Sequence, residues 1–241
     1  MPKYLHLANK LGEKINSLNF GELLPTEHEL MDDHDVSRVT AREALRELEV
    51  RHLVRRERGS GTRVALRLPY PIKDGEAPSW SQLVRDAGHV ATRKVAEITR
   101  GTPPEVVAKE LIISESKHVT KISRMGLVNN EVATYQEHWL IESPKNLEES
   151  MNNGESLTYS LQQHLGYRIV RNWSRVDLIP APIGVAKALQ LIGQPPVWHI
   201  KSVNGCAKLR KPVEYSESFM RADAFHVYLE FGETQKSIGE L

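Results

Sequence analysis

The sequence has a single cysteine, Cys206, among its 241 residues. One thiol excludes an internal disulfide framework and a metal site built from several thiolates, and it fits a reducing compartment. No apolar run approaches the roughly 20 residues that a membrane helix needs, and the first residues lack the apolar core of a signal peptide. We therefore expect a cytoplasmic protein that does not associate with membranes.

Residue clusters that mark catalytic or metal sites are also missing from the sequence. None of the ten histidines belongs to an H-x-x-x-H pair or a Cys/His cluster. The glycines at Gly59 and Gly61 form neither a nucleophile elbow nor a phosphate-binding loop. We therefore expect no catalytic residue, no metal and no cofactor, and we do not expect an enzyme.

Net charge is low, at +1 for the whole chain, but basic residues are concentrated in one stretch. Between Arg38 and Arg63 there are eight arginines and four acidic residues, and the residues before this stretch are acidic. Hydrophobic residues make up 40% and charged residues 26%, which is typical of a globular chain able to form a core in each of two domains. The basic stretch is thus the first candidate for contact with nucleic acid.

Three helical patterns fill the first fifty residues. Apolar residues at helical spacing between Leu5 and Leu18 predict the first helix. Thr26 lies three residues before Glu29, which is the spacing of a capping box at the start of a short second helix. Ser37 is placed to cap a third helix that continues to Val50.

A hairpin and a second domain follow these helices. Short alternating runs at 53–56 and 62–65 flank two glycines and predict a β-hairpin, so residues 1–67 should form a winged helix-turn-helix. Residues 68–78, rich in proline and glycine, suit a linker. In residues 79–241, strand-like and helical runs alternate, which predicts an α+β fold with a largely antiparallel sheet.

Two segments resemble known families. The run from Leu24 to Val64 contains PTEHEL, VSRVTAREAL and RGSGT in order, and it resembles the DNA-binding domain of the GntR family. The remainder resembles the UTRA effector-binding domain of the HutC branch, whose fold is like that of chorismate lyase, and it ends in the signature PVEYSESFMRAD at 212–223. The stretch Pro69-Tyr70-Pro71 and this signature are most similar to phosphonate-utilisation regulators of the PhnF type.

The GntR resemblance implies that the third helix enters the major groove and that the wing enters the minor groove of DNA. Arginines of the helix would contact guanines or phosphates, and its hydroxyls would hold phosphate oxygens. The alternatives are a solvated charged helix face and a plain hairpin turn. The DNA-binding residues expected from the resemblance are Glu27, His28, Ser37, Arg38, Val39, Thr40, Arg42, Arg58, Gly59, Ser60, Gly61 and Thr62.

Three positions depart from the usual GntR pattern. His28 stands where the family usually has arginine, and Val39 stands where it often has threonine. Both positions tend to face DNA, so we expect an operator that differs from the family's usual sequence. His52 replaces a common glycine before the wing, which is unfavourable if the backbone there needs a positive φ.

The UTRA resemblance implies a ligand pocket. Hydroxyls at helix starts together with an arginine would bind a phosphonate, a phosphate ester or a carboxylate. Gly126, Thr158 and Met220 depart from the arginine, tyrosine and aromatic residue that are frequent at these positions. Four of the pocket residues also have a structural alternative. Trp80 could be a core residue, Ser156 a helix cap, Arg124 an exposed cation and Glu214 part of a surface ion pair. The expected effector-binding residues are Ser79, Trp80, Ser81, Arg124, Ser156, Thr158, Glu214 and Met220.

Together these patterns predict a ligand-responsive transcriptional regulator. We expect a repressor that binds double-stranded DNA at an inverted-repeat operator as a homodimer and is released by a small anionic metabolite, with phosphonate utilisation as one candidate process. Two alternatives remain open at this point: an enzyme domain of the chorismate lyase kind, and an architectural DNA binder that responds to no ligand.

Overall fold

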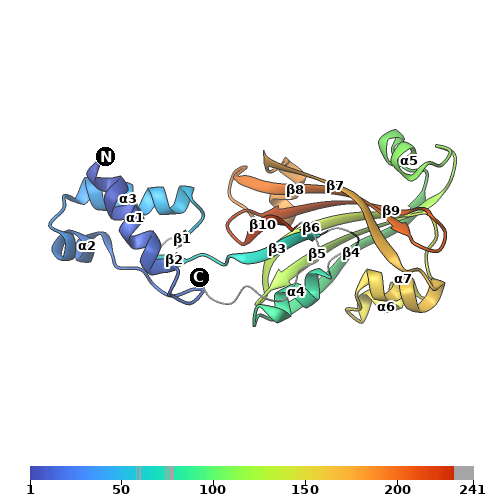
Figure 1. Cartoon of the computed structure of the whole chain (residues 1–241), viewed down its shortest axis with the longest axis horizontal. Helices are drawn as coiled ribbons and strands as arrows, with labels where there is room; N and C mark the ends of the chain where they lie inside the picture. The colour runs from blue at the N-terminus through green and yellow to red at the C-terminus, as the bar shows by residue number, and fades with distance from the viewer. Residues whose placement is uncertain (58, 60, 74, 76–78, 231–241) are drawn as a thin grey trace. The chain divides into compact units, whose positions relative to one another are not determined.

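The computed structural model describes residues 1–57, 59, 61–73, 75 and 79–230, and the chain divides into two compact units (Figure 1). The first unit comprises Met1–Leu68 and Ala222–His226, and the second comprises Pro69–Arg221 and the residues from Val227 onward. Each unit has its own buried hydrophobic cluster. We describe each unit separately.

The first unit is a helix-turn-helix followed by a two-stranded wing. The capping box at the second helix is confirmed, because the Glu29 backbone N–H donates to Thr26 Oγ1 at 3.3 Å and the Thr26 N–H donates to Glu29 Oε2 at 2.7 Å. Ser37 also caps the third helix, since its Oγ accepts from the Thr40 N–H at 3.2 Å. The elements are α1 Lys3–Ile15, α2 Glu27–His34, α3 Arg38–Val50, β1 Val54–Glu57 and β2 Gly61–Val64.

The core of the first unit lies between α1 and α3. On α3, Ala41 and Ala44 are fully buried, and such small side chains let the two helices approach closely. Leu30 from α2 and Leu48 from α3 are also fully buried, and each contributes about 1.5–3 kcal/mol of burial free energy. This packing fixes the inner face of α3 and leaves its opposite face at the surface.

Three residues with positive φ lie in the wing or directly before it. Gly59 and Gly61 have φ values of 81° and 88° at the hairpin turn. His52, directly before the wing, has a φ of 56°. The structure therefore shows that the backbone at His52 does adopt the left-handed conformation for which glycine is best suited.

The second unit is built around a six-stranded antiparallel sheet in the order β4-β5-β6-β9-β8-β7. A separate two-stranded sheet pairs β3 with β10, so the segment expected as a linker at 68–78 contains a strand that the sequence patterns did not predict. The strands are β3 Leu68–Lys73, β4 Ala91–Gly101, β5 Val119–Val128, β6 Glu131–Leu140, β7 Ile169–Pro180, β8 Pro196–Cys206, β9 Lys211–Arg221 and β10 Phe225–Glu230.

Helices cover both faces of the six-stranded sheet. Residues of α6 and α7 pack with Ile122 and Leu140 on one face, and α4 lies on this same side (Figure 1). Residues of α5 pack with Trp139 and Tyr215 on the other face, as do residues of α8 with Phe219. The helices are α4 Trp80–Asp86, α5 Glu105–Leu111, α6 Leu147–Asn152, α7 Leu157–Leu165 and α8 Ile183–Ala188.

The predicted α+β class and antiparallel sheet are confirmed, and the structure contains one helix, α6, that the sequence patterns did not predict. Because side chains alternate along a strand, residues 136 and 138 of β6 lie on the same face as residues 214, 216 and 218 of β9. No helix in the described part of the chain is long and apolar enough to cross a membrane.

The strain at His52 generates a stability prediction. A left-handed backbone costs a residue with a Cβ roughly 1–2 kcal/mol, whereas glycine costs roughly 0.5–1 kcal/mol in lost chain entropy. His52→Gly should therefore raise the unfolding free energy of the first unit by roughly 0.5–1 kcal/mol. Calorimetry of the full chain checks this, with His52→Ala as the control that keeps the strain. A glycine variant that melts at or below the wild-type temperature would contradict the prediction.

Candidate functional site

The exposed face of α3 displays two arginines close together. Arg38 and Arg42 are one helical turn apart, and 70% and 53% of their side-chain surfaces are exposed. Both lie in the N-terminal half of α3, the part of a recognition helix that contacts base edges in helix-turn-helix proteins.

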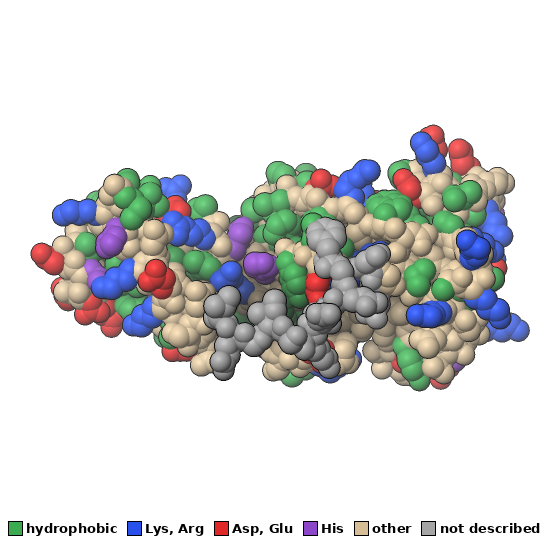
Figure 2. All heavy atoms as spheres, in the orientation of Figure 1, with side chains coloured by type: hydrophobic (Ala, Val, Ile, Leu, Met, Phe, Trp, Pro, Cys, Tyr) green, Lys and Arg blue, Asp and Glu red, His purple; other side chains and the backbone are tan. Residues whose placement is uncertain are grey.

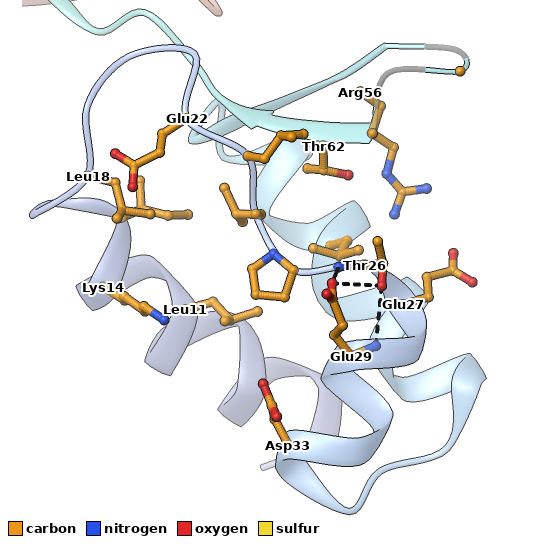
Figure 3. A pocket seen from close by; sticks show the side chains of 17 residues that line it. Leu11, Lys14, Leu18, Glu22, Thr26, Glu27, Glu29, Asp33, Arg56 and Thr62 are labelled. Carbon is orange, nitrogen blue, oxygen red and sulfur yellow. Dashed lines mark hydrogen bonds between the residues drawn. The ribbon is translucent and has the colours of Figure 1, made fainter.

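Glu27, on the first turn of α2, holds both arginines. Its Oε2 accepts from Arg38 Nε at 3.1 Å, and its Oε1 lies 3.4 Å from Arg42 Nε. The hydrogen bond from Arg38 lowers the pKa of the Glu27 carboxyl below its ordinary value. Figure 3 shows Arg56 reaching from the wing toward Glu27, so this carboxylate lies among three guanidinium groups. Glu27 therefore sets the positions of the Arg38 and Arg42 guanidinium groups in the unbound protein.

The other residues predicted to bind DNA lie around this pair. Ser37 Oγ and Thr40 Oγ1 are 2.9 Å apart at the start of α3, and Thr62 lies in strand β2 of the wing. His28 is exposed and lies 3.0 Å from Asp32, so its imidazole faces solvent. Gly59 is exposed at the turn. Two further predictions, Arg58 and Ser60, lie outside the described residues.

Charge on the first unit is mixed. Figure 2 shows lysine and arginine side chains interspersed with aspartate and glutamate over the visible face of this unit. Several arginines of the basic stretch are bound internally: Arg51 pairs with Glu47 at 2.9 Å, and Arg63 Nη1 donates to the Gly21 carbonyl at 2.9 Å. The three arginines of α3 itself, Arg38, Arg42 and Arg46, all remain largely exposed.

A groove of about 1300 Å³ lies between α1, α2 and the wing of the first unit (Figure 3). Its lining combines apolar side chains such as Leu11 and Leu18 with the acidic residues Glu22, Glu29 and Asp33. Carboxylates repel phosphates and other anions. Its four carboxylates, of Glu22, Glu27, Glu29 and Asp33, outnumber the two cations Lys14 and Arg56, so the groove is a poor site for an anionic ligand.

The second unit encloses a small polar cavity of about 50 Å³ on the α4, α6 and α7 side of the sheet. Ser81 and Arg124 are among its buried polar residues. Such a volume has room for a few water molecules or a compact ligand. The lining residues are Tyr70, Ser79, Trp80, Ser81, Arg93, Arg124, Gln136, His138, Ser156, Leu157, Thr158, Arg171, Ile200, Ser202, Asn204, Glu214, Ser216 and Ser218.

A chain of hydrogen bonds runs across the floor of this cavity. Arg124 Nε donates to His138 Nε2 at 3.1 Å, and His138 Nδ1 lies 2.6 Å from Glu214 Oε1. Asn204 Nδ2 donates to the other carboxylate oxygen of Glu214 at 2.8 Å, and Arg171 Nε donates to Asn204 Oδ1 at 3.5 Å. The five residues come from β5, β6, β9, β8 and β7 in spatial order.

Burial sets the protonation states along this chain. Burial and the nearby Arg124 charge lower the pKa of His138 to about 4, so the imidazole is neutral at pH 7. A neutral ring that accepts at Nε2 must carry its proton on Nδ1, which donates to Glu214. Burial raises the pKa of Glu214, but the hydrogen bonds from His138 and Asn204 outweigh it, so the net pKa is lowered. Burial lowers the pKa of Arg124 to about 10, which leaves it charged.

Arg93 supplies a second cation opposite a glycine. It lies directly across from Gly126 in the β4–β5 pair, stacks 4.1 Å from the centre of the Trp80 ring, and donates to Gln136. Burial and the Arg124 charge hold the pKa of Arg93 well below its ordinary value. A Cβ on Gly126 would lie 2.8 Å from the Trp80 ring and 2.5 Å from Thr134 Oγ1. The missing side chain at 126 therefore makes room for Trp80 under Arg93.

The cavity has more positive than negative charge. Arg93, Arg124 and Arg171 contribute three positive charges, and Glu214 contributes one negative charge, which leaves an excess of two. Within the described part of the chain, the buried Nη1 of Arg171 and Nε1 of Trp80 have no hydrogen-bond partner. Buried donors without partners are costly, so the cavity is suited to an acceptor that carries negative charge.

Seven of the eight predicted effector residues line the cavity, and Met220 does not, since it is fully buried elsewhere in the sheet. Trp80 fits the alternative of a core tryptophan, since it is 3% exposed, but the other three alternatives do not fit. Arg124 is buried instead of exposed, Glu214 pairs with a buried histidine, and Ser156 makes no side-chain cap although it precedes α7. Sequence patterns missed nine polar lining residues, whose signal was only their alternation along strands: Tyr70, Arg93, Gln136, His138, Arg171, Ser202, Asn204, Ser216 and Ser218.

Two family models match the chain. The model described as bacterial regulatory proteins, gntR family, matches residues 3–64, and the UTRA domain model matches residues 86–226. These ranges cover the helix-turn-helix with its wing and most of the second unit, including the cavity lining except for Tyr70, Ser79, Trp80 and Ser81.

Individual relatives match over nearly the full length. The HTH-type transcriptional regulator GgaR of Escherichia coli K12 is 30% identical over 93% of this chain and 89% of its own. The probable transcriptional regulator PhnF of Escherichia coli K12 is 24% identical over 95% of each chain. The crystal structure of PhnF from Mycobacterium smegmatis superposes with a TM-score of 0.66 at 21% identity, over 93% of this chain and 98% of its own, and shows a shared fold.

The neutral state of His138 generates a pH prediction. Its folded pKa of about 4 lies below the value near 6.5 of an unfolded histidine, so the unfolded chain binds more protons between these values. The unfolding free energy of the second unit should therefore fall with acidification, by roughly 1.5 kcal/mol from pH 6.5 to pH 5. Urea titrations at several pH values measure this slope, and nitrogen NMR should show His138 with its proton on Nδ1 at pH 5.5.

The control for this prediction is His138→Gln, which has no titrating group and should lose the corresponding part of the slope. A wild-type imidazole that becomes charged near pH 6.5 would show that burial does not hold it neutral.

Proposed function

Because the chain belongs to the GntR family of bacterial regulatory proteins and carries a UTRA domain, we propose that it is a cytoplasmic transcriptional repressor of the HutC branch. It binds an inverted-repeat operator as a homodimer and leaves it when a small anion occupies the cavity of the second unit. The relatives' own names describe transcriptional regulators, and some describe repressors, such as the mannosyl-D-glycerate transport/metabolism system repressor MngR of Escherichia coli K12.

The exposed arginines of α3 support the DNA-reading part. Arg38 and Arg42 project from the N-terminal half of the helix, where guanine O6 and N7 or phosphate oxygens come within reach. Ser37 and Thr40 add hydroxyls at the helix start, where backbone N–H groups favour phosphate. Gly59 and Gly61 have positive φ and no side chain, so the backbone at these two positions of the wing can approach a groove closely.

The excess positive charge in the cavity is the observation on which the effector part rests. The Arg124 charge repels Arg93 and lowers its pKa, and the cavity's carboxylate, Glu214, already accepts from His138 and Asn204. A bound anion would offset this repulsion and accept from the buried donors of Trp80 and Arg171. Phosphonates, phosphate esters and small carboxylates have this chemistry, and the volume of about 50 Å³ favours the smallest of them.

An Arg124 variant tests the effector site. Arg124→Ala removes a buried cation, so the stabilisation by methylphosphonate or inorganic phosphate should disappear. In the wild type, a ligand at 100 times its dissociation constant adds roughly 2.7 kcal/mol of stability. Thermal shift and calorimetry measure the effect, and Arg175→Ala, an exposed arginine on the other face of the sheet, is the matched control. An unchanged response in the Arg124 variant would contradict the proposed site.

The oligomeric state is a separate prediction. One recognition helix reads too few base pairs to be unique in a genome, so a twofold dimer is expected to read two half-sites. Light scattering at micromolar concentration should give about twice the chain mass of 27.3 kDa. A monomer under these conditions would argue against an inverted-repeat operator.

A further inference from the structure

One apolar side chain stands on the face of α3 that points furthest from the core of the first unit. Successive residues of a helix are 100° apart, and the buried residues of α3 gather on one side. Val39 lies almost opposite this side, and it is 69% exposed. The buried residues that define the inner side are Ala41, Ala44, Leu45 and Leu48.

The neighbours of Val39 are the residues most suited to contact DNA. It directly follows Arg38, and Arg42 lies three residues further along the same surface. Glu27 fixes both guanidinium groups at 3.1 and 3.4 Å and so leaves the valine uncovered beside them. Val39 is the second residue of α3, within the turn that a recognition helix places against base edges.

Stability gives no reason for a valine at this position. An exposed β-branched residue has lower helix propensity than alanine, and Val39 contributes nothing to the buried cluster of the first unit. A valine cannot donate or accept a hydrogen bond, so phosphates and the polar edges of bases offer it no favourable contact. The apolar group that base pairs display in the major groove is the 5-methyl group of thymine.

We propose that Val39 is a specificity-determining residue that reads the 5-methyl group of a thymine in each operator half-site, next to the bases or phosphates contacted by Arg38 and Arg42. This inference rests on the proposed DNA-binding function and adds to it a base identity. It also gives a physical meaning to the valine that replaces the family's frequent threonine, because a valine has two methyl groups and no hydroxyl.

Removal of single methyl groups from DNA tests the proposal directly. An operator is first selected from random double-stranded DNA with the full-length protein, and each thymine is then replaced by deoxyuridine, which differs only by the methyl group. At one position in each half-site, uracil should weaken binding by about fourfold per half-site, the factor that corresponds to one buried methyl. The other replacements should have little effect.

Protein variants assign the effect to this side chain. Val39→Ala should bind the thymine and uracil operators equally, and Val39→Thr, which keeps one methyl group, should retain part of the difference. Val50→Ala is the matched control, because Val50 is a valine of the same helix that is 66% exposed but lies at the C-terminal end. It should discriminate thymine from uracil as the wild type does.

The outcomes separate this proposal from the proposed function. If an operator is selected but uracil is tolerated at every position, or if Val39→Ala still distinguishes the two operators, the role of Val39 is wrong and the DNA-binding function stands. If the wild-type protein selects no sequence at all, both fail. Circular dichroism of the variants confirms that each is folded, as expected for a change at an exposed position.

Discussion

The hydrogen-bonded chain from Arg124 through His138, Glu214 and Asn204 to Arg171 is the interaction on which the second unit depends. It crosses five adjacent strands of the six-stranded sheet, so it forms only when every strand is paired in the observed register. A shift of one residue in any strand would turn its member to the opposite face. The chain therefore ties the cavity to the fold of the whole sheet.

The state of each member depends on the next. Neutral His138 satisfies Arg124 Nε on one side and donates to Glu214 on the other, so the proton can occupy only one of its nitrogens. Glu214 stays ionised because two donors hold it. His138 is neutral, and the single negative charge of Glu214 cannot balance the three arginines of the cavity. The positive charge of the cavity therefore follows from the protonation states that the network sets. A ligand that carries negative charge would complete the arrangement without breaking any of these bonds.

Local patterns predicted the elements well. The capping box of Thr26 and Glu29, the cap at Ser37 and the glycines of the wing each depend on residues close in sequence, and each is present. Pairing across distant strands could not be predicted in the same way. Arg93 and Arg171 reach the cavity because β4 and β7, at opposite edges of the sheet, flank it, and no short-range pattern encodes that position.

Two departures from the family pattern, at Gly126 and His52, differ in how the structure accommodates them. Gly126 lacks a side chain because Trp80 occupies that space, and Arg93 on the facing strand contributes the cation that the glycine cannot. His52 has no such compensation in its backbone, which adopts a positive φ despite its Cβ. One departure is thus accommodated by packing, and the other remains a local cost.

The arginines of the two units differ in how deeply they and their acidic partners are buried. Around Glu27, the pairs with Arg38 and Arg42 are exposed, and such pairs are worth no more than about 1 kcal/mol, so DNA phosphates or bases can replace the carboxylate at little cost. Around Glu214, the partners are buried, and removal of one would leave an uncompensated charge. The exposed arginines of α3 are therefore free to rearrange, whereas the polar groups of the cavity are held in place by folding. Under the proposed function, an anion would gain affinity from that preorganisation, because folding has already met the cost of assembling the donors.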